Sequence, residues 1–348
     1  MAVTLRDVAA HAGVSAITVS RALNNSGYVS QDVRARVITS ATELGYVQNA
    51  VASSLRANKT QLIALLAGVT NPFWSNVARG IEDTAMEAGY GLIMCDTADE
   101  PAKEARYIDL LTRRRIDGLI IAATQDSAPI LQNLKKRRQP FVLIDRVVEG
   151  VAADSVRGDN FGAAYQMTRH LISTGYTRIG MVSGAHNVST AEERVEGYRS
   201  ALAESGMETE DTILYGQYSE IWGYQATKEL MLRENPPEAL FAANNFIALG
   251  ILECLHTLGL RVPEDVAIVC FDDTTKVESA RLLTTASQPA EEMGRAATHL
   301  LLQLIDNPDK APEEIVLPID LMIRNSCGCG TTNKPVNRSR RESLQTAS

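Results

Sequence analysis

Polar residues of the types that bind sugars follow several apolar segments of this 348-residue chain. Taken singly, an aspartate or arginine after a strand more often caps a helix or forms a surface ion pair. As a set they offer paired polar atoms that each satisfy two sugar hydroxyls, and aromatic rings that cover the C–H face of a sugar. The candidate ligand-binding residues are Asn71, Phe73, Trp74, Asp145, Arg146, Arg194, Asn244, Asp272 and Gln288.

A second group of residues, near the amino terminus, is suited to reading DNA. Arg21 can donate two hydrogen bonds to a guanine edge, while Ala16 and Ile17 offer apolar contact, for example to a thymine methyl group. Hydroxyl and amide side chains suit phosphate oxygens, which fix the register of a protein on DNA without reading its sequence. Such side chains here are Ser15, Thr18 and Asn24.

The DNA-reading candidates lie in a segment, residues 1–47, that has the pattern of three short helices. Thr4, Ser15 and Ser30 stand where N-caps are expected, with apolar residues at helical spacing behind each of them. Gly13 lies in a tight turn between the first two helices. A helix, a glycine-containing turn and a second capped helix indicate a helix-turn-helix, although a three-helix unit of this size can also be a protein-binding module.

The ligand-binding candidates lie in a different pattern, which begins at Gln61. Strands are expected at 62–69, 92–95, 118–122, 141–144, 178–182, 238–241 and 266–271. Alternation with helices of about a dozen residues indicates βαβ crossovers and parallel sheets. Ligands of such folds bind outside the carboxyl ends of the strands, and most of the candidates follow strands.

These patterns predict an all-α helix-turn-helix headpiece and an α/β core of two doubly wound parallel-sheet lobes. The expected parts are the headpiece 1–47, a hinge or linker 48–60, the core 61–330 and a disordered tail 331–348. Within the core we expect one lobe at about 61–160 plus 291–320, and the other at about 161–290 plus 321–330.

Charge is unevenly distributed along the chain. The formal net charge is −8, yet residues 1–60 hold six basic and three acidic side chains, which leaves +3 there and −11 elsewhere. A small basic head on an acidic body favours nucleic acid as the partner of the head. The sequence has neither a run of about 20 apolar residues nor a signal-peptide pattern. We therefore expect no membrane partner and a cytoplasmic, nucleoid-associated location.

The five cysteines are odd in number and lie mostly in apolar runs, which indicates reduced thiols. Cys327 and Cys329 are close in sequence, but two sulfurs without further ligands in the tail fall short of the four that zinc prefers, so the end of a strand is expected there. His170 is expected on a helix, as a surface or packing residue. Phosphate-binding loops, dinucleotide fingerprints and HExxH motifs do not occur, and we predict no cofactor, metal or catalytic residue.

The headpiece closely resembles that of the lactose-repressor (LacI/GalR) family. The matching segments include Thr4-Leu5-Arg6-Asp7-Val8-Ala9, Ala12-Gly13-Val14-Ser15 and Thr18-Val19-Ser20-Arg21-Ala22-Leu23-Asn24, and the resemblance extends to about Gly330. It implies a transcriptional repressor that binds a pseudo-palindromic operator as a homodimer, or as a tetramer built from dimers. The expected DNA-contacting residues are Thr4, Ser15, Ala16, Ile17, Thr18, Ser20, Arg21, Asn24, Ser30, Leu55 and Arg56.

In that family, the segment that matches residues 49–56 folds into a hinge helix on the operator. A leucine at the position of Leu55 wedges into the minor groove, where unstacking a base step bends the duplex. Leu55 can alternatively pack against the core. Gln48 stands where a proline is usual and Ser53 where an arginine is common, so the attraction of the hinge for phosphates should be weaker by about one counterion.

The core is similar to the periplasmic ribose-binding proteins, which implies a monosaccharide effector, with a pentose such as ribose as the first choice. Trp74 stands where a second phenylalanine is usual, Asn245 where an aspartate is expected, and Asp273 where a small or amide residue is expected. A hexose, a sugar acid or a purine therefore remains an alternative effector. Asp145 and Asp272 disfavour a sugar acid, because they would repel its carboxylate, unless the positive charges of Arg146 and Arg194 dominate.

Two other classes of protein fit parts of the sequence. A sugar-binding protein without a DNA role would need a signal peptide and no basic head, and an enzyme would consume the sugar that it binds. We expect a regulator that is not an enzyme, in which sugar closes the lobes, shifts the dimer interface and relieves repression.

Overall fold

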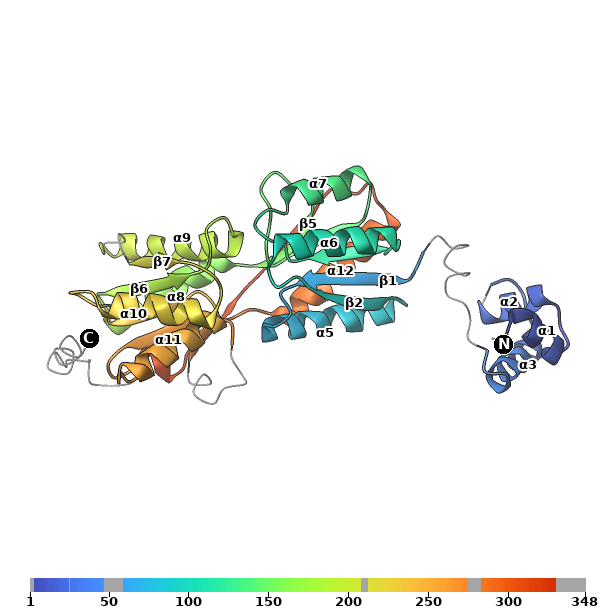
Figure 1. Ribbon diagram of the computed structural model, residues 1–348, viewed down its shortest axis with the longest axis horizontal. Coiled ribbons are helices and arrows are strands. Elements are labelled where there is room, and N and C mark those ends of the chain that lie inside the picture. The colour runs from blue at the N-terminus through green and yellow to red at the C-terminus, as the bar shows by residue number, and fades with distance from the viewer. Residues whose placement is uncertain (1–2, 25, 47–58, 208–211, 274–282, 330–348) are drawn as a thin grey trace. The chain divides into compact units, whose positions relative to one another are not determined.

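The computed structural model describes residues 3–24, 26–46, 59–207, 212–273 and 283–329. The chain divides into two compact units, residues 1–60 and 61–348. The predicted helix-turn-helix headpiece and two-lobed α/β core are both confirmed (Figure 1). In the described part of the chain, no helix is long and apolar enough to span a membrane.

The first unit is a three-helix domain made of α1 (Leu5–Ala12), α2 (Ala16–Leu23) and α3 (Gln31–Glu43). Its small core contains Val8, Val19 and Val37, one from each helix, and all three are fully buried. Thr4 forms a capping box with Asp7 at the start of α1, and the Ser15 hydroxyl accepts a hydrogen bond from the amide of Thr18 at the start of α2.

The cap predicted for the third helix is only partly correct. Ser30 occupies the N-cap position of α3, but its side chain makes no capping hydrogen bond. Its hydroxyl is therefore not committed to the helix end and lies exposed on the surface of the headpiece.

The first lobe of the second unit is a fully parallel six-stranded sheet in the order β11-β5-β4-β3-β1-β2. Its strands are β1 (Leu62–Ala67), β2 (Gly91–Asp96), β3 (Gly118–Ile121), β4 (Phe141–Ile144), β5 (Asp154–Gly158) and β11 (Glu314–Leu317). Its helices are α5 (Pro72–Glu87), α6 (Pro101–Arg113), α7 (Ala128–Lys136) and α12 (Ala290–Asp306). Ile63 and Leu65 of β1 face α5 and α12, whereas Ala64 and Leu66 face α6 and α7, so both sides of this sheet are buried.

The second lobe repeats this arrangement in the order β12-β10-β9-β8-β6-β7, with β12 antiparallel to β10. Its strands are β6 (Ile179–Ser183), β7 (Ile213–Tyr215), β8 (Ala239–Ala242), β9 (Ala267–Phe271), β10 (Thr284–Ser287) and β12 (Asp320–Met322). Its helices are α8 (Asn160–Thr174), α9 (Ser189–Glu204), α10 (Glu220–Met231), α11 (Asn245–Thr257) and the short 3-10 helix η2 (Asn325–Cys327). The strand end predicted at Cys327 is therefore wrong, because β12 ends at Met322 and a helical turn follows.

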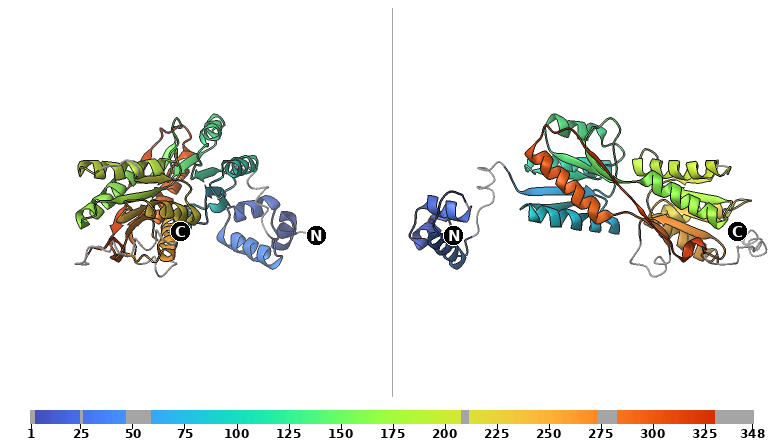
Figure 2. Two further views of the ribbon diagram at one scale, coloured as in Figure 1. Left: turned by 60° about the vertical axis from the view of Figure 1, so that its left-hand side comes forward. Right: turned by 180° about the vertical axis from the view of Figure 1, so that it is seen from behind.

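The chain passes between the two lobes three times, after β5, after β10 and after β11. These connections are visible in the view from behind (Figure 2, right). Because each sheet contains strands from both sides of a crossover, neither lobe is one continuous stretch of sequence.

Candidate functional site

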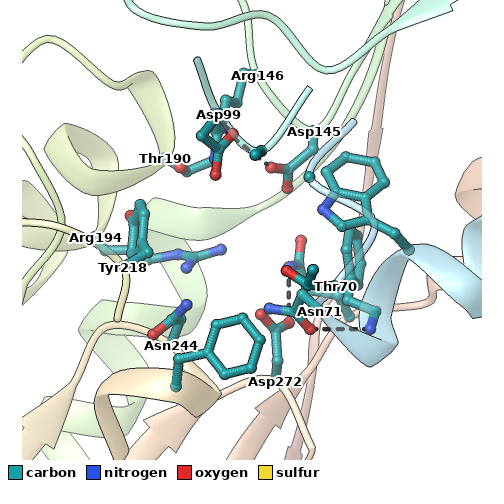
Figure 3. Close-up of a pocket in the computed structure, with 16 residues that line it drawn as sticks. Thr70, Asn71, Asp99, Asp145, Arg146, Thr190, Arg194, Tyr218, Asn244 and Asp272 are labelled. Atoms are coloured by element: carbon teal, nitrogen blue, oxygen red, sulfur yellow. Dashed lines mark hydrogen bonds and ion pairs between the residues drawn. The ribbon is translucent and has the colours of Figure 1, made fainter. Parts of the chain in front are cut away.

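A cavity of about 190 Å³ lies between the two lobes, at the carboxyl ends of their strands (Figure 3). The first lobe lines it with the loops after β1, β2 and β4, and with the start of α5. The second lobe contributes α9, the loops after β7, β8, β9 and β10, and the start of α11. All nine residues that the sequence suggested line this cavity: Asn71, Phe73, Trp74, Asp145, Arg146, Arg194, Asn244, Asp272 and Gln288.

Asp145 and Asp272 occupy equivalent positions in the two lobes. Each follows a central strand in the left-handed backbone region, with φ of 67° and 63° respectively, which is uncommon for residues other than glycine but more accessible to aspartate than to most. Each amide donates to the neighbouring strand, from Asp145 to the carbonyl of Val156 at 2.8 Å and from Asp272 to that of Ala286 at 3.0 Å. The same turn thus presents one carboxylate from each lobe, and Figure 3 shows the two on opposite sides of the cavity.

Burial disfavours the charged form of both carboxylates. It raises the pKa of Asp145 from 3.8 to about 6, although Arg146 and Arg194 counteract part of this shift. Burial also raises the pKa of Asp272, against the opposing effects of Arg194 and of a hydrogen bond from Gln288. The cavity therefore holds two acceptors that protein groups solvate only in part.

Two arginines offset the acidic charge, and other residues fix both of them. Arg146 Nη1 contacts Asp99 Oδ1 at 2.8 Å. Arg194 donates from Nε to Asn160 Oδ1 at 2.8 Å and from Nη1 to the carbonyl of Ala243 at 2.6 Å. The guanidinium carbon of Arg194 also lies 4.0 Å from the centre of the Phe271 ring. Both side chains are therefore held in place before any ligand arrives.

Four buried polar atoms that belong to residues lining the cavity lack a hydrogen-bond partner within the described residues. They are Asp145 Oδ1, Arg146 Nε, Tyr218 Oη and Gln288 Oε1. Buried polar groups are nearly always hydrogen-bonded, since an unpaired one costs about 1–3 kcal/mol. This clustering of donors and acceptors indicates a site for a polar ligand.

Asn71 and Asn245 join the lobes beside this cavity. Asn71 Nδ2 donates to Asn245 Oδ1 at 2.9 Å, and Asn245 Nδ2 donates back to Asn71 Oδ1 at 3.0 Å. An aspartate at position 245 could only accept, so the asparagine found there allows this reciprocal pair. We call these two residues the amide latch.

Sequence reasoning missed five polar or aromatic residues that line the cavity: Thr70, Asp99, Thr190, Tyr218 and Phe246. Asp99 follows β2, so the rule that located Asp145 could have found it. Tyr218 precedes α10, after the short and partly exposed strand β7, which the sequence did not reveal. Its position could not be inferred without the fold.

The headpiece presents a separate surface on α2 and the adjoining loop. The Ile17 side chain is 65% exposed, and Arg21 is also exposed, as expected of residues that contact DNA. Ser15 and Thr18 are less available than expected, because their hydroxyls lie 2.8 Å apart in a mutual hydrogen bond. Tyr28, which is 92% exposed, was not among the predicted contacts. Leu55 and Arg56 lie outside the described residues.

A helix-turn-helix domain with an exposed second helix, followed by a two-lobed α/β core with a polar cavity, defines a ligand-responsive DNA-binding regulator. Comparison with protein families agrees with this class. Residues 4–49 match the bacterial regulatory proteins of the lacI family. Residues 59–325 match the periplasmic binding proteins and sugar binding domain of LacI family. The chain belongs to the LacI family of transcriptional regulators.

Relatives match over nearly the whole chain. The ribose operon repressor of Escherichia coli (strain K12) is 32% identical over 93% of this chain and 99% of its own length. The HTH-type transcriptional regulator DegA of Bacillus subtilis (strain 168) is 32% identical over 94% of this chain and 98% of its own. These relatives are DNA-binding regulators, and the same role holds for this chain.

Solved structures agree in fold as well. The lac repressor dimer bound to operator and the anti-inducer ONPF has a TM-score of 0.83 at 26% identity and covers 94% of this chain and 99% of its own. A LacI family regulator from Enterococcus faecium with bound ribose has a TM-score of 0.68 at 34% identity, over 79% of this chain and 100% of its own.

Proposed function

We propose that the cavity between the lobes binds a monosaccharide, with a pentose such as ribose as the first choice, and that this ligand controls operator affinity. The four buried polar atoms that make no hydrogen bond within the described residues carry the proposal, because a polyol supplies both donors and acceptors within one small molecule. The contacting residues are those predicted from the sequence, together with Asp99, Thr190 and Tyr218.

The size of the cavity favours a single sugar ring. Its volume of about 190 Å³ is below the usual range of about 300–1,000 Å³ for pockets that hold drug-sized ligands. Phe73 and Trp74, whose ring centres are 4.9 Å apart in an edge-to-face pair, supply an apolar wall for the C–H face of the ring. The ribose found in the related regulator and the name of the ribose operon repressor support a pentose in particular.

A thermal-shift screen with pentoses, hexoses, sugar acids and purines tests the ligand class. A tight ligand raises the melting temperature by mass action, and we expect the largest rise with a pentose. The matched variant is Asp272→Ala, which should greatly reduce that rise at the same sugar concentration, because it weakens sugar binding. A larger rise with a purine, or a pentose effect that persists in the variant, would contradict the proposal.

We further propose that the headpiece binds a pseudo-palindromic operator as a homodimer, or as a tetramer built from dimers, in the cytoplasm and on the nucleoid. Arg21, Ala16 and Ile17 read bases, and Leu55 wedges into the minor groove. The other contacts to the DNA backbone come from Thr4, Ser15, Thr18, Ser20, Asn24, Ser30 and Arg56. Binding to palindromes near the chain's own gene, measured with and without the sugar, tests this assignment.

Sugar is expected to weaken operator binding about 5- to 150-fold, the range of common coupling energies. The sugar is bound and not consumed, because the role proposed here requires reversible occupancy. Incubation of the protein with the sugar, followed by quantification of the sugar, should therefore return all of it. Failure to bind any such palindrome, whatever sugar is added, would overturn the regulatory role proposed here.

A further inference from the structure

Three residues with metal-binding side chains meet in the second lobe, and none of them lines the cavity. His170 comes from α8, Cys327 from η2, and Cys329 follows two residues later. The ring nitrogen of the histidine and the two sulfurs all lie within 4.8 Å of one another. The two cysteines were apparent in the sequence, but His170 was not expected near them, because more than 150 residues separate it from the cysteines.

The turn that carries the two cysteines is held rigidly. Ser326 Oγ donates to the carbonyl of Ile268 in β9 at 2.6 Å and accepts from the amide of Thr284 in β10 at 2.7 Å. Gly328 adopts a left-handed conformation, with φ of 71°, which curls the chain back on itself. The two sulfurs consequently lie 3.0 Å apart on the same side of the turn.

His170, on α8, completes the group. Its Nε2 atom is buried, and the side chain interacts with the Cys327 thiol beside it. Hydroxyls of Ser173 and Thr174 donate to its backbone carbonyl, which fixes the last turn of α8. A buried imidazole nitrogen next to two thiols provides the nitrogen and sulfur ligands that zinc prefers.

We propose that His170 Nε2, Cys327 Sγ and Cys329 Sγ bind one Zn²⁺ ion. Zinc prefers four tetrahedral nitrogen and sulfur ligands, and sites with three protein ligands leave the fourth position to water. Cys329 is exposed, so the fourth position can be open to solvent.

Binding requires a small movement and the release of two protons. Tetrahedral zinc with Zn–S bonds of about 2.3 Å holds two sulfurs about 3.8 Å apart. The present 3.0 Å must therefore widen by less than 1 Å, which the exposed Cys329 can provide. Each thiol loses its proton to solvent when its sulfur binds the ion. The bound ion would link the end of α8 to the segment that follows β12.

Competition with a chromogenic chelator tests the site in the full-length, reduced and metal-stripped protein. We expect one Zn²⁺ per chain, and a loss of affinity of at least about 10- to 100-fold in each of His170→Gln and Cys329→Ser. The matched controls are His256→Gln, an exposed histidine on α11, and Cys95→Ala in the other lobe, and both should bind zinc as the unmodified chain does. Cys327 is fully buried, so a substitution there would also disturb the packing of the lobe. The test therefore uses variants of the other two ligands.

Binding of Co²⁺ provides a second, spectroscopic measurement that reports the sulfur ligands directly and does not depend on the stability of the fold. Thiolate-to-cobalt charge transfer should appear in the ultraviolet spectrum and fall by about half in Cys329→Ser, which keeps one of the two sulfur ligands. Absence of stoichiometric zinc, or unchanged zinc affinity in His170→Gln and Cys329→Ser, would overturn the proposal. A Cys327–Cys329 disulfide that forms in air, with no zinc uptake by the reduced chain, would overturn it in favour of a redox pair.

Discussion

Asp145 and Asp272 combine two features that a structural role alone would not require. Both are buried, and both adopt the left-handed backbone conformation, which few residues other than glycine use. Asp145 leaves one oxygen without a hydrogen bond among the described residues. We infer that the ligand-free protein sacrifices stability at these positions in order to present acceptors to a ligand.

The pH dependence of stability follows from the raised pKa of Asp145. Because its pKa is about 6 in the folded chain and near 3.8 otherwise, the folded state holds this proton more tightly than the unfolded state. The favourable contribution of the protonated Asp145 to the free energy of unfolding is complete below about pH 4 and is lost as the pH rises through about 6. The uncharged side chain of Asp145→Asn avoids this loss. The free energy of unfolding of the variant should therefore be higher than that of the unmodified protein by on the order of 2–3 kcal/mol at pH 8, and only slightly higher at pH 4.

Urea denaturation of the ligand-free protein at several pH values measures this difference. The control is Asp126→Asn, which removes an exposed carboxylate from the same lobe. A gain in stability that is equal at pH 4 and pH 8 would show that the charge of Asp145 is not its source.

Asp272 should be required for the sugar response and not for DNA binding. Its carboxylate accepts a hydrogen bond from Gln288 at 2.8 Å and faces the cavity, within the unit that does not contain the headpiece. Asp272→Ala is expected to weaken sugar binding by about 10- to 150-fold, the range for a hydrogen bond to a charged group, and to leave operator affinity without sugar unchanged. Calorimetry with the sugar and fluorescence anisotropy with operator DNA separate the two effects. Equal losses in both would contradict this assignment.

At the scale of elements, glycines set how closely the paired helices approach. A Cβ atom on Gly80 of α5 would lie 2.0 Å from the carbonyl oxygen of Glu291 in α12, and one on Gly294 would lie 2.2 Å from that of Val77. Gly80→Ala must therefore push the helices apart and should cost about 1–3 kcal/mol of unfolding free energy, as overpacking does. Chemical denaturation measures the loss. Glu82→Ala, an exposed change in the same helix, is the control, and an equal effect there would argue against steric overlap.

The recognition helix α2 makes a prediction that is independent of the core. Arg21 and Ile17 are both exposed on this helix, whereas Val19 and Ala22 hold it against the rest of the headpiece. Arg21→Ala should remove about 1–3 kcal/mol of discrimination at one base pair and leave sugar affinity unchanged. Binding to operators that differ at single base pairs reveals which position loses its preference. A loss of sugar affinity as well would contradict the assignment of DNA binding to the headpiece.

How well each element could be predicted depends on where it lies in the sheets. The central strands β1 and β4, with sequences LIALLA and FVLI, are covered on both faces and appear as uninterrupted apolar runs. The strands β5, with sequence DSVRG, and β10, with sequence TTAS, were missed because side-chain hydrogen bonds and ion pairs replace part of their apolar packing. Most of the nine cavity residues could be predicted because the carboxyl-end rule needs only strand positions, whereas Arg194 on α9 and Gln288 after the missed strand β10 depended on the resemblance to ribose-binding proteins. The approach of His170 to two cysteines depends on tertiary packing, which leaves no local pattern.

At the scale of the whole molecule, the two lobes have the same strand order, and the chain crosses between them three times. Three connections permit the lobes to move about a common hinge while restricting other motions. A ligand that contacts both lobes favours the arrangement in which they are close together. It shifts that equilibrium only by the difference between its affinities for the two arrangements.

The amide latch provides a way to change that equilibrium through Asn245, which does not itself line the cavity. Asn245 is not among the residues that line the cavity, yet its two hydrogen bonds to Asn71 connect the lobes. These bonds should stabilise the closed arrangement by about 1–2 kcal/mol. Asn245→Ala should therefore raise the dissociation constant of the sugar by about 5- to 30-fold, although every direct contact to the sugar remains.

Calorimetry with Asn245→Ala, with Asn71→Ala and with the double variant isolates the coupling between these two residues. Asn133→Ala, an exposed change on α7, serves as the control. If sugar releases the operator by closing the lobes, loss of the latch should leave operator affinity without sugar unchanged or raise it, since the open arrangement is then favoured. A weaker sugar affinity combined with weaker operator affinity would mean that Asn245 supports the fold as a whole. Unchanged sugar affinity would mean that the crossovers alone, and not the latch, set the position of the lobes.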